Sequence, residues 1–292
     1  MAVLTNTVLT SDVASALNIE FAKRFDGQVN DLARVLGIVS PEVMAAGTTL
    51  YQVTVTGSLN TDSRNEGDIV PLSKYGTTIA NMDSLTPVPY RKLTTAEAVL
   101  KAGVTNAVLR EDAKMLSDIR NNVVADFFTG LATGTGVATG TSFQDALAQS
   151  DATIQDAMET NHDTAGRLVH FVNMFDIADY LGKANITVQN VFGMTYLENF
   201  LGIENVFVTN KVAKGNIIVT PSENLHLYAV DFASLSSAGL PYQTMDGGFI
   251  GVSHEPSYER FGVITNAATG VKFYAEVLDY IVKATFGETP SA

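Results

Sequence analysis

One long amphipathic pattern constrains this chain more than any other stretch. Between Val104 and Leu131, apolar side chains recur at steps of four and seven residues, and charges of both signs lie between them. They form two adjacent rows: Val104, Val108, Met115, Ile119, Val123 and Phe127, then Leu109, Leu116, Val124 and Phe128. Gly130 and Gly134 follow as a stop signal. The pattern predicts one helix of about seven turns that covers a sheet built by the rest of the chain.

Composition excludes several classes of protein. The 292 residues are 46% apolar, which is enough for a sizeable core, and the formal net charge of -13 argues against a strong non-specific grip on nucleic acid. Because there is no cysteine, disulfides, thiolate nucleophiles and zinc ribbons are impossible. The N-terminus lacks a basic and apolar leader, and no window has about 18 consecutive apolar residues, so we expect neither secretion nor a membrane span.

The first 45 residues alternate short apolar groups with polar ones. Their one helical pattern, Ala16 to Phe25, is brief. Residues 1–45 are therefore predicted to form an extended arm with a short helix in it. Such an arm cannot hold a core of its own, so it has to lie on another surface, either of its own subunit or of a neighbour.

Residues 46–97 are predicted to form a long two-stranded excursion. Tyr51, Val53 and Val55 alternate with polar residues in a first strand, and a second strand-like region covers residues 75–80 and 85–93. Pro87 and Pro89 place this second region at a sheet edge, because proline cannot donate a ladder hydrogen bond. A two-stranded ribbon is marginal alone in water, so we expect it to lean on a partner, although an ordinary surface hairpin fits the pattern equally well.

The ribbon's polar tip carries the candidate contact residues. Arg64, Glu66 and Asp68 lie in a segment dense in turn formers, and Lys74 follows within the same excursion. We expect these four residues to meet a neighbouring subunit.

Downstream of the long helix, helices and strands mix. Gly134, Gly136 and Gly140 superficially suggest a phosphate-cradling loop, but they follow a helix and lack the Lys-Ser or Lys-Thr of such loops, so a flexible or tightly turning connection is expected. Ser142 with Asp145 resembles a capping box that opens a helix. The rest is predicted to comprise a strand at 167–172, short helices at 173–181 and 191–201 closed by glycine, strands at 205–209, 216–220 and 225–230, and long strands between 251 and 286.

No catalytic constellation is visible in the sequence. The histidines His162, His170, His226 and His254 are scattered without metal-ligand spacing, and no Gly-x-Ser-x-Gly elbow supports a hydrolase triad. The acidic residues near the predicted helix at 143–158 fit a solvated face better than acid-base work. The sequence therefore favours binding or construction over catalysis, with no cofactor and no metal.

At this level of detail the chain resembles the major capsid proteins of tailed bacteriophages, the Hong Kong 97 type. The resemblance runs over nearly the whole chain through ordered motifs: Gly47-Thr48-Thr49-Leu50, Glu66-Gly67-Asp68-Ile69, Tyr90-Arg91-Lys92-Leu93, the glycine run from Gly134 to Gly140, Phe171-Val172-Asn173-Met174-Phe175-Asp176, Gly202 to Thr209 with Lys214 to Ile217, and Val252 to Glu255 with Phe273 to Phe286. One departure is Met174, where the family often has proline.

The resemblance implies an α+β capsid fold with defined parts. These are an N-terminal arm (1–45), an extended loop (46–97), a peripheral domain (98–141 and 251–286) with a spine helix at 104–131, an axial domain (142–250) and a tail (287–292). It also implies a structural protein, not an enzyme, whose pentamers and hexamers close an icosahedral shell around double-stranded DNA. Such a chain would be assembled in the bacterial cytoplasm and reside in the virion capsid.

Partners and alternatives follow from the same resemblance. Because the arm starts within a few residues of Met1, a separate scaffolding protein is expected, together with a portal protein. Lys74 lies in the extended loop, but no partner or catalytic carboxylate can be named for a covalent cross-link, so we expect none. Two alternatives remain: an encapsulin-like bacterial nanocompartment shell, and a soluble α/β enzyme that binds phosphate at its glycine-rich connection.

Overall fold

The fold is described from a computed structural model. It describes residues 10–38, 42–67, 69–103, 108–164, 166–181, 189–233, 235, 239–240, 242–244 and 248–287. The helices are α1 (Thr10–Leu36), α2 (Ala96–Ala102), α3 (Arg110–Leu131), α4 (Phe143–Thr160) and α5 (Met174–Leu181). The strands are β1 (Glu42–Met44), β2 (Thr49–Ser58), β3 (Lys74–Ser84), β4 (Val88–Thr95), β5 (Gly136–Gly140), β6 (Leu168–Asn173), β7 (Gln189–Val191), β8 (Met194–Phe200), β9 (Ile203–Thr209), β10 (Asn216–Pro221), β11 (Leu225–Val230), β12 (Ile250–Ser257), β13 (Gly262–Thr269), β14 (Lys272–Ala275) and β15 (Val282–Phe286).

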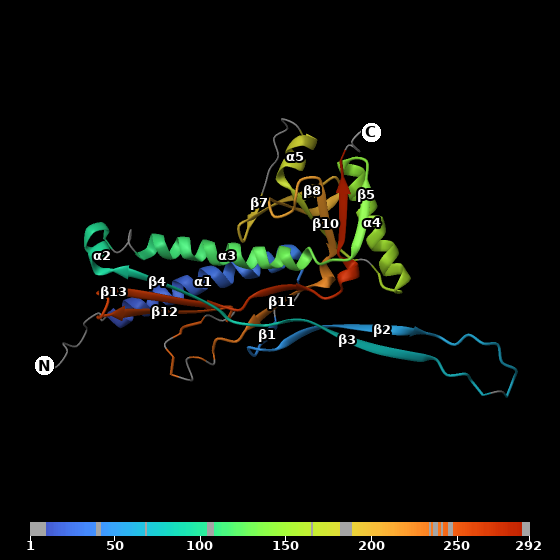
Figure 1. Cartoon of the computed structure of the whole chain (residues 1–292), viewed down its shortest axis with the longest axis horizontal. Coiled ribbons are helices and arrows are strands. Elements are labelled where there is room, and N and C mark those ends of the chain that lie inside the picture. The colour runs from blue at the N-terminus through green and yellow to red at the C-terminus, as the bar shows by residue number, and fades with distance from the viewer. Residues whose placement is uncertain are drawn as a thin grey trace.

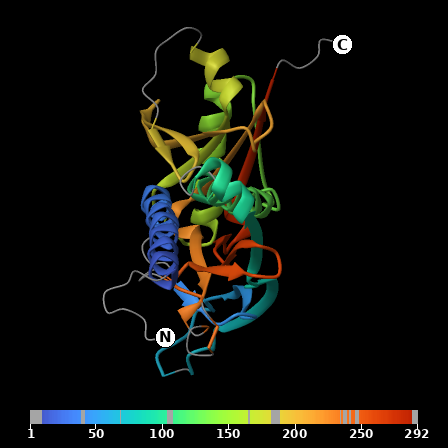
Figure 2. The ribbon, with the colours of Figure 1, turned by 90° about the vertical axis from the view of Figure 1, so that its left-hand side faces the viewer.

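A seven-stranded sheet joins two hydrophobic cores. Its strand order is β5-β15-β10-β6-β9-β8-β7, and the unit that it forms with α4 and α5 stands above an elongated lower part (Figures 1 and 2). Successive side chains of its central strands point to opposite faces: Phe171 and Ile218 enter the core beneath α3, whereas Val172 and Ile217 enter the core under α4. The central strands are therefore apolar on both faces.

Helix α4 covers the second face of this sheet, and it begins at the predicted cap. The hydroxyl group of Ser142 accepts a hydrogen bond from the amide of Asp145 at 3.3 Å, and the carboxylate of Asp145 accepts one from the amide of Thr141 at 2.7 Å. The first bond satisfies an amide group that the first turn of the helix would otherwise leave without a partner, and the second fixes the residue before the cap. The predicted apolar face is buried at Phe143, Ala146, Leu147, Ile154 and Met158.

The elongated lower part holds the spine helix. Its described portion is helical from Val108 to Leu131, with the α-helix proper beginning at Arg110, and the predicted start at Val104 lies outside the described residues. Phe127 packs against the rings of Phe171 and Phe273 at centroid distances of 5.6 and 5.5 Å. Since Phe171 and Phe273 lie on β6 and β14, the helix covers strands from two sheets, as expected.

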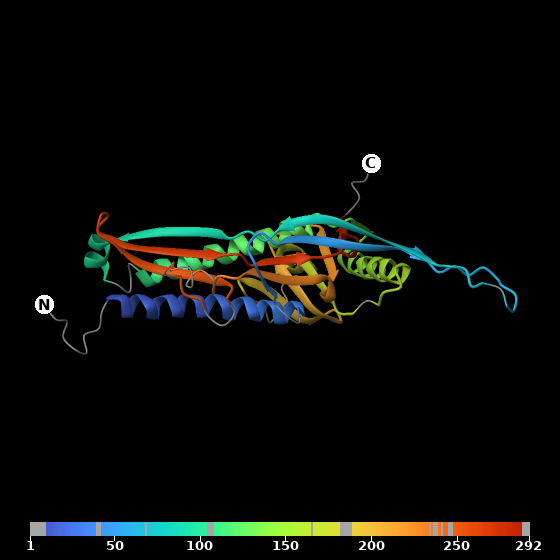
Figure 3. The same cartoon turned by 90° about the horizontal axis from the view of Figure 1, so that it is seen from below.

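The N-terminal segment is not an extended arm. Helix α1 spans 27 residues and runs along β12 on its own subunit (Figures 1 and 3). Phe21, Phe25, Val29, Leu32 and Leu36 are all at most 5% exposed and form one apolar stripe at steps of three and four residues. The prediction of a short helix in an extended arm is therefore wrong, because this stripe continues well beyond Phe25.

The glycine-rich connection is also more regular than predicted. Gly136–Gly140 forms strand β5, which pairs in parallel with β15. A Cβ atom on Gly134 would lie 2.5 Å from the Cβ of Ile281, and one on Gly140 would lie 2.3 Å from the backbone nitrogen of Ala146. The glycines therefore permit close packing of neighbouring segments, and the expectation of a flexible or turning connection is wrong over these five residues.

Residues 191–201 form strands where the sequence predicts a helix. Strands β7 and β8 pair through the turn at Phe192 and Gly193, and β8 pairs with β9 through Leu201 and Gly202. All four turn residues have positive φ angles, between 48° and 85°, which is the geometry of tight hairpin turns. The glycines thus connect strands and do not cap a helix at Gly202; Gly182, the predicted cap of α5, lies outside the described residues.

The later strands separate into three sheets. β12 and β13 pair with each other, β14 pairs with β11, and β15 enters the seven-stranded sheet. Strand β4 pairs with β13 and leaves the ribbon at that point; it is an edge strand, as the proline at position 89 predicts.

Candidate subunit interface

The most prominent feature for contact with other molecules is a ribbon that projects beyond the body. Strands β2 and β3 form a two-stranded antiparallel sheet from Thr49 opposite Ser84 to Ser58 opposite Lys74, with one irregularity between Leu50 and Tyr51. The ribbon extends from one end of the long axis, and α2 lies at the opposite end (Figures 1 and 3). The predicted long excursion is thus confirmed for residues 49–58 and 74–84.

The ribbon is anchored at its base. Leu50 is 5% exposed and Leu85 is 1% exposed, and Leu85 packs in a small core with Val230, Phe232 and Ala268. The amide of Gly47 donates to the carbonyl of Leu85, and the amide of Leu85 donates to the carbonyl of Thr48, both at 2.8 Å. The base is therefore fixed to the body. Beyond the base, the described side chains of both strands are exposed to solvent.

The tip exposes apolar side chains that the sequence analysis did not select. Leu59 is 70% exposed, Ile69 94%, Val70 62% and Leu72 92%. Farther back, the ribbon also exposes Tyr51, Tyr75 and Ile79. An isolated exposed apolar residue is ordinary, but a group on one projection marks an interaction surface. The run Ile69-Val70-Pro71-Leu72 is the sequence signal that could have identified it.

The predicted charged contact residues lie in the same projection. Arg64 and Glu66 are exposed in the tip, and Lys74 is exposed at the first position of β3. The tip is drawn together where the amide of Asn60 donates to the Ser73 hydroxyl at 2.9 Å. Asp68 lies outside the described residues.

An apolar hollow lies at the other end of the molecule. It has a volume of about 390 Å³ and is formed by α2, the end of β4 and the turn between β12 and β13. Its walls include Leu100, Tyr258 and Phe261, which are 81%, 91% and 59% exposed. The molecule therefore presents apolar surface at both ends of its long axis, one projecting and one concave.

A group of ionisable side chains is buried beneath the helices. Asp112 accepts from Lys92 at 2.8 Å and lies 3.2 Å from Nε2 of His254, whose Nδ1 faces the side chain of Asn18. Burial alone would raise the pKa of Asp112, but hydrogen bonds and charge attraction from His254 and Lys92 outweigh it and hold that pKa below the usual range. The cluster ties α1 and α3 to β4 and β12.

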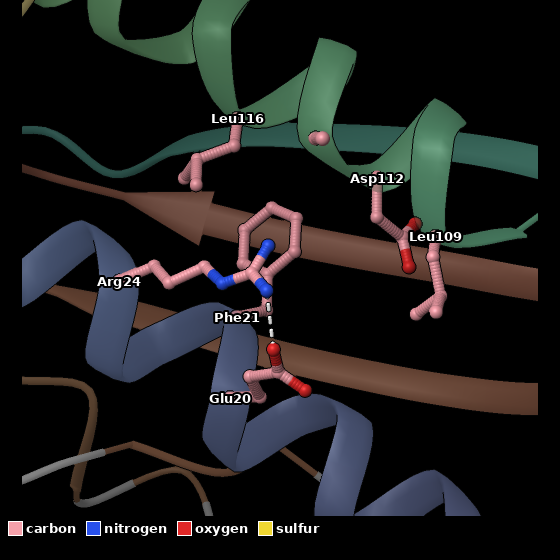
Figure 4. Close-up of a pocket in the computed structure, with 7 residues that line it drawn as sticks. Glu20, Phe21, Arg24, Leu109, Asp112 and Leu116 are labelled. Atoms are coloured by element: carbon pink, nitrogen blue, oxygen red, sulfur yellow. Dashed lines mark hydrogen bonds and ion pairs between the residues drawn. The ribbon is translucent and has the colours of Figure 1, made fainter. Parts of the chain in front are cut away.

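The adjoining cavity leaves no room for a substrate. Figure 4 shows it between α1 and α3, where Arg24 pairs with Glu20 and the ring of Phe21 lies beside Leu116. Its volume is about 20 Å³, roughly the space of one water molecule. A buried, hydrogen-bonded cluster beside so small a space acts as a structural tie.

The glycine-rich segment is not built to hold a phosphate group. The amide of Gly134 donates to the carbonyl of Leu131 at 3.2 Å, and that of Gly136 donates to Ile281 at 3.1 Å. In the first turn of α4 the amide of Asp145 donates to the Ser142 hydroxyl, and just before that helix the amide of Thr141 donates to the Asp145 carboxylate. Because these donors have partners within the chain, they are not directed at a ligand, which argues against the phosphate-binding alternative.

The described residues hold neither a metal-ligand cluster nor a membrane-spanning helix. Within them, no three histidine, aspartate or glutamate side chains gather in a way that could hold a metal ion. None of the helices in that part of the chain is long and apolar enough to cross a membrane.

Comparison with known proteins yields matches in structure only. No protein-family model matches this chain, and neither does any curated protein sequence. A chain of Mycobacterium phage Che8 is 12% identical, with a TM-score of 0.50 over 100% of this chain and 95% of the other. The capsid of an empty GTA particle is 11% identical, with a TM-score of 0.54 over 87% and 90%. The capsid structure of the cyanophage P-SCSP1u is 11% identical, with a TM-score of 0.50 over 86% of each chain.

This chain has a tailed-phage capsid fold. The matches extend over nearly the whole chain. The α+β fold of the Hong Kong 97 type, which the ordered motifs imply, is therefore confirmed.

Proposed function

We propose that this chain is a major capsid protein that assembles into pentamers and hexamers of an icosahedral shell enclosing double-stranded DNA. The observation that carries the proposal is the ribbon, which exposes a group of large apolar side chains on a chain with a tailed-phage capsid fold. Its place would be the virion capsid, after assembly in the bacterial cytoplasm.

The two ends of the molecule support head-to-tail contacts between copies. An apolar projection at one end and an apolar hollow at the other are different surfaces, so a contact between them is heterologous. Repeated heterologous contacts close into rings when the rotation between copies allows it. A ribbon that lies across a neighbour would gain the burial that its own subunit does not provide.

Within this proposal the capsid domains keep their sequence boundaries. Residues 46–97 are the extended loop, 98–141 and 251–286 the peripheral domain, 142–250 the axial domain and 287–292 the tail. Strands β12 and β13 would belong to the peripheral domain and pair with β4, which comes from the last part of the 46–97 range, and strands β6 to β10 of the seven-stranded sheet would belong to the axial domain. Strands β5 and β15 come from peripheral ranges but pair inside the axial sheet, so they join the two domains.

The proposed partners are other copies of this chain, a separate scaffolding protein, a portal protein and packaged DNA without sequence-specific contacts. The formal net charge of -13 suits a shell that encloses DNA without clustered cationic contacts to its phosphates. The proposal requires no cofactor.

The test is to express the chain, alone and with the scaffolding protein encoded beside it, and to examine it by sedimentation and negative-stain electron microscopy. Large closed particles of repeating capsomers are expected. A stable monomer under all conditions would contradict the proposal. The proteins that co-purify separate the nanocompartment alternative, because an enclosed enzyme indicates a compartment and a portal indicates a phage.

A further inference from the structure

A buried carboxyl group on α1 has no role in the ribbon or in the buried cluster around Asp112. Asp26 follows Phe25 on the face that packs against the body, and it is only 5% exposed. Neither of its carboxyl oxygens has a hydrogen-bond partner of acceptable geometry. Burying an ionised carboxylate without partners costs free energy, so burial favours the neutral, protonated form of Asp26.

The surroundings of Asp26 reinforce this preference. Burial raises the pKa of Asp26 to about 7, and the nearby amide of Phe249 offsets only part of the rise. Because the ordinary value is 3.8, the carboxyl group binds its proton in the docked helix under conditions in which an exposed aspartate is ionised.

No cation among the described residues pairs with Asp26. The elements that pack most against α1 are β12, with His254 and Glu255, and β7, which carries no ionisable side chain. The third is α3, whose charged residues include Asp112 and Arg120; the Nε of Arg120 is buried, and no ion pair joins Arg120 to Asp26. His254 contacts both Asp112 and Asn18. Asn18 lies eight residues, or about 12 Å, along the helix from Asp26.

The remaining ionisable groups near Asp26 are accounted for separately. Glu255 accepts a hydrogen bond from Ser253 at 2.7 Å. The neighbouring charged residues of α1 are Glu20, Lys23, Arg24 and Asp31, and all are exposed. Asp246 lies outside the described residues.

Other contacts of α1 do not depend on a carboxyl group. At its C-terminal end the carbonyl of Val35 accepts from Arg167 at 2.9 Å and from Asn205 at 3.3 Å. The apolar stripe supplies the rest of the attachment. Ionisation of Asp26 therefore acts on a helix that is otherwise well attached.

We propose that docking of α1 on the body is linked to one proton carried by Asp26, so that the helix is docked with a neutral carboxyl group and opens more readily once that group ionises. The sign follows from the two protonation equilibria. Between pH 3.8 and about 7 the docked helix binds more protons than the open one, so docking weakens as the pH rises. The opening equilibrium should increase up to about ten-fold per pH unit across this window and become constant above it.

Hydrogen exchange of the full chain, measured by mass spectrometry between pH 4.5 and 8.5, tests this linkage. At each pH the opening constant of α1 in the unchanged chain is divided by that of the Asp26→Asn variant, which cancels the intrinsic pH dependence of exchange. The ratio should rise with pH to about pH 7 and then level off. A ratio that stays constant over the whole range overturns the proposal.

Two further measurements make the test independent of that one variant. Asp31→Asn removes an exposed carboxylate from the same helix, where Asp31 pairs with Arg34 at 3.1 Å. The opening constant of α1 in the unchanged chain, divided by that in the Asp31→Asn variant, should not change with pH. In the unchanged chain with ¹³C-carboxyl-labelled aspartate, one buried carboxyl group should titrate near pH 7. If every aspartate is ionised by pH 5, the linkage does not exist, whether or not the Asp26→Asn variant folds.

Discussion

Replacing the two most exposed apolar residues of the ribbon tip should separate folding from assembly. Ile69 is 94% exposed and Leu72 is 92% exposed, so neither contributes measurable burial within its own subunit. The double variant Ile69→Ser with Leu72→Ser should change the free energy of unfolding of the unassembled subunit by less than about 0.5 kcal/mol.

The effect on association should be much larger. Full burial of an isoleucine or leucine side chain stabilises by about 1.5–3 kcal/mol, so the two together would contribute roughly 3–6 kcal/mol at each contact. Because 1.4 kcal/mol corresponds to a factor of ten, the association constant per contact should fall by roughly 10²–10⁴.

Sedimentation velocity over a range of protein concentrations measures this loss, and thermal unfolding of the unassembled subunit measures folding. Leu240→Ser is the matched control, because Leu240 is exposed (48%) but lies outside the ribbon. The reasoning is refuted if the double variant assembles at the same concentration as the parent chain, or if the control loses assembly equally.

Three further substitutions test other features. Glu66→Lys reverses a charge in the exposed tip and should impair particle formation in electron micrographs without lowering Tm; unchanged particles would remove Glu66 from the interface. Gly140→Ala places a Cβ atom 2.3 Å from a backbone nitrogen and should destabilise by about 1–3 kcal/mol in urea, whereas Gly130→Ala, with open space, should not destabilise. Asp112→Ala removes the contact of Lys92 at 2.8 Å, leaves Lys92 the longer contact with Glu111 at 3.4 Å, and should cost about 1–3 kcal/mol at neutral pH. Because the pKa of Asp112 is lowered, this difference from the parent chain should shrink as the pH falls below 3.8, and a difference independent of pH would contradict the assignment.

The sequence alone predicts an element correctly where its local residue pattern matches the burial of that element in the fold. The cap at Ser142, the buried face of α4 and the strand Leu225–Val230 were all predictable, because polar caps and apolar periodicity directly determine these elements. The ordered motifs also predicted the capsid fold that the structural matches confirm.

The errors occurred where tertiary packing outweighs local preference. Helix α1 continues through Gly27 because its buried stripe compensates for the low helix propensity of glycine, and a Cβ atom at Gly27 would meet nothing within 4 Å. In β5, the glycines are explained only by the distant residues Ile281 and Ala146, which no local pattern shows.

The candidate interface was only partly predictable. Charge and turn chemistry located the tip at Arg64 and Glu66, but the apolar residues beside them were not among the predicted contact residues. Their exposure depends on how far the ribbon leaves the body, which is a property of the whole fold.

The position of β15 also affects how this chain folds during translation. Its five residues, Val282–Phe286, lie between β5 and β10, so a nascent chain has both neighbouring strands before it has the strand that separates them. Until Val282–Phe286 has left the ribosome, β5 and β10 each keep an unpaired edge, and such edges invite pairing with other chains. Completion of the sheet is therefore a late event, and a chaperone that shields β10 during synthesis should raise the yield of native subunits.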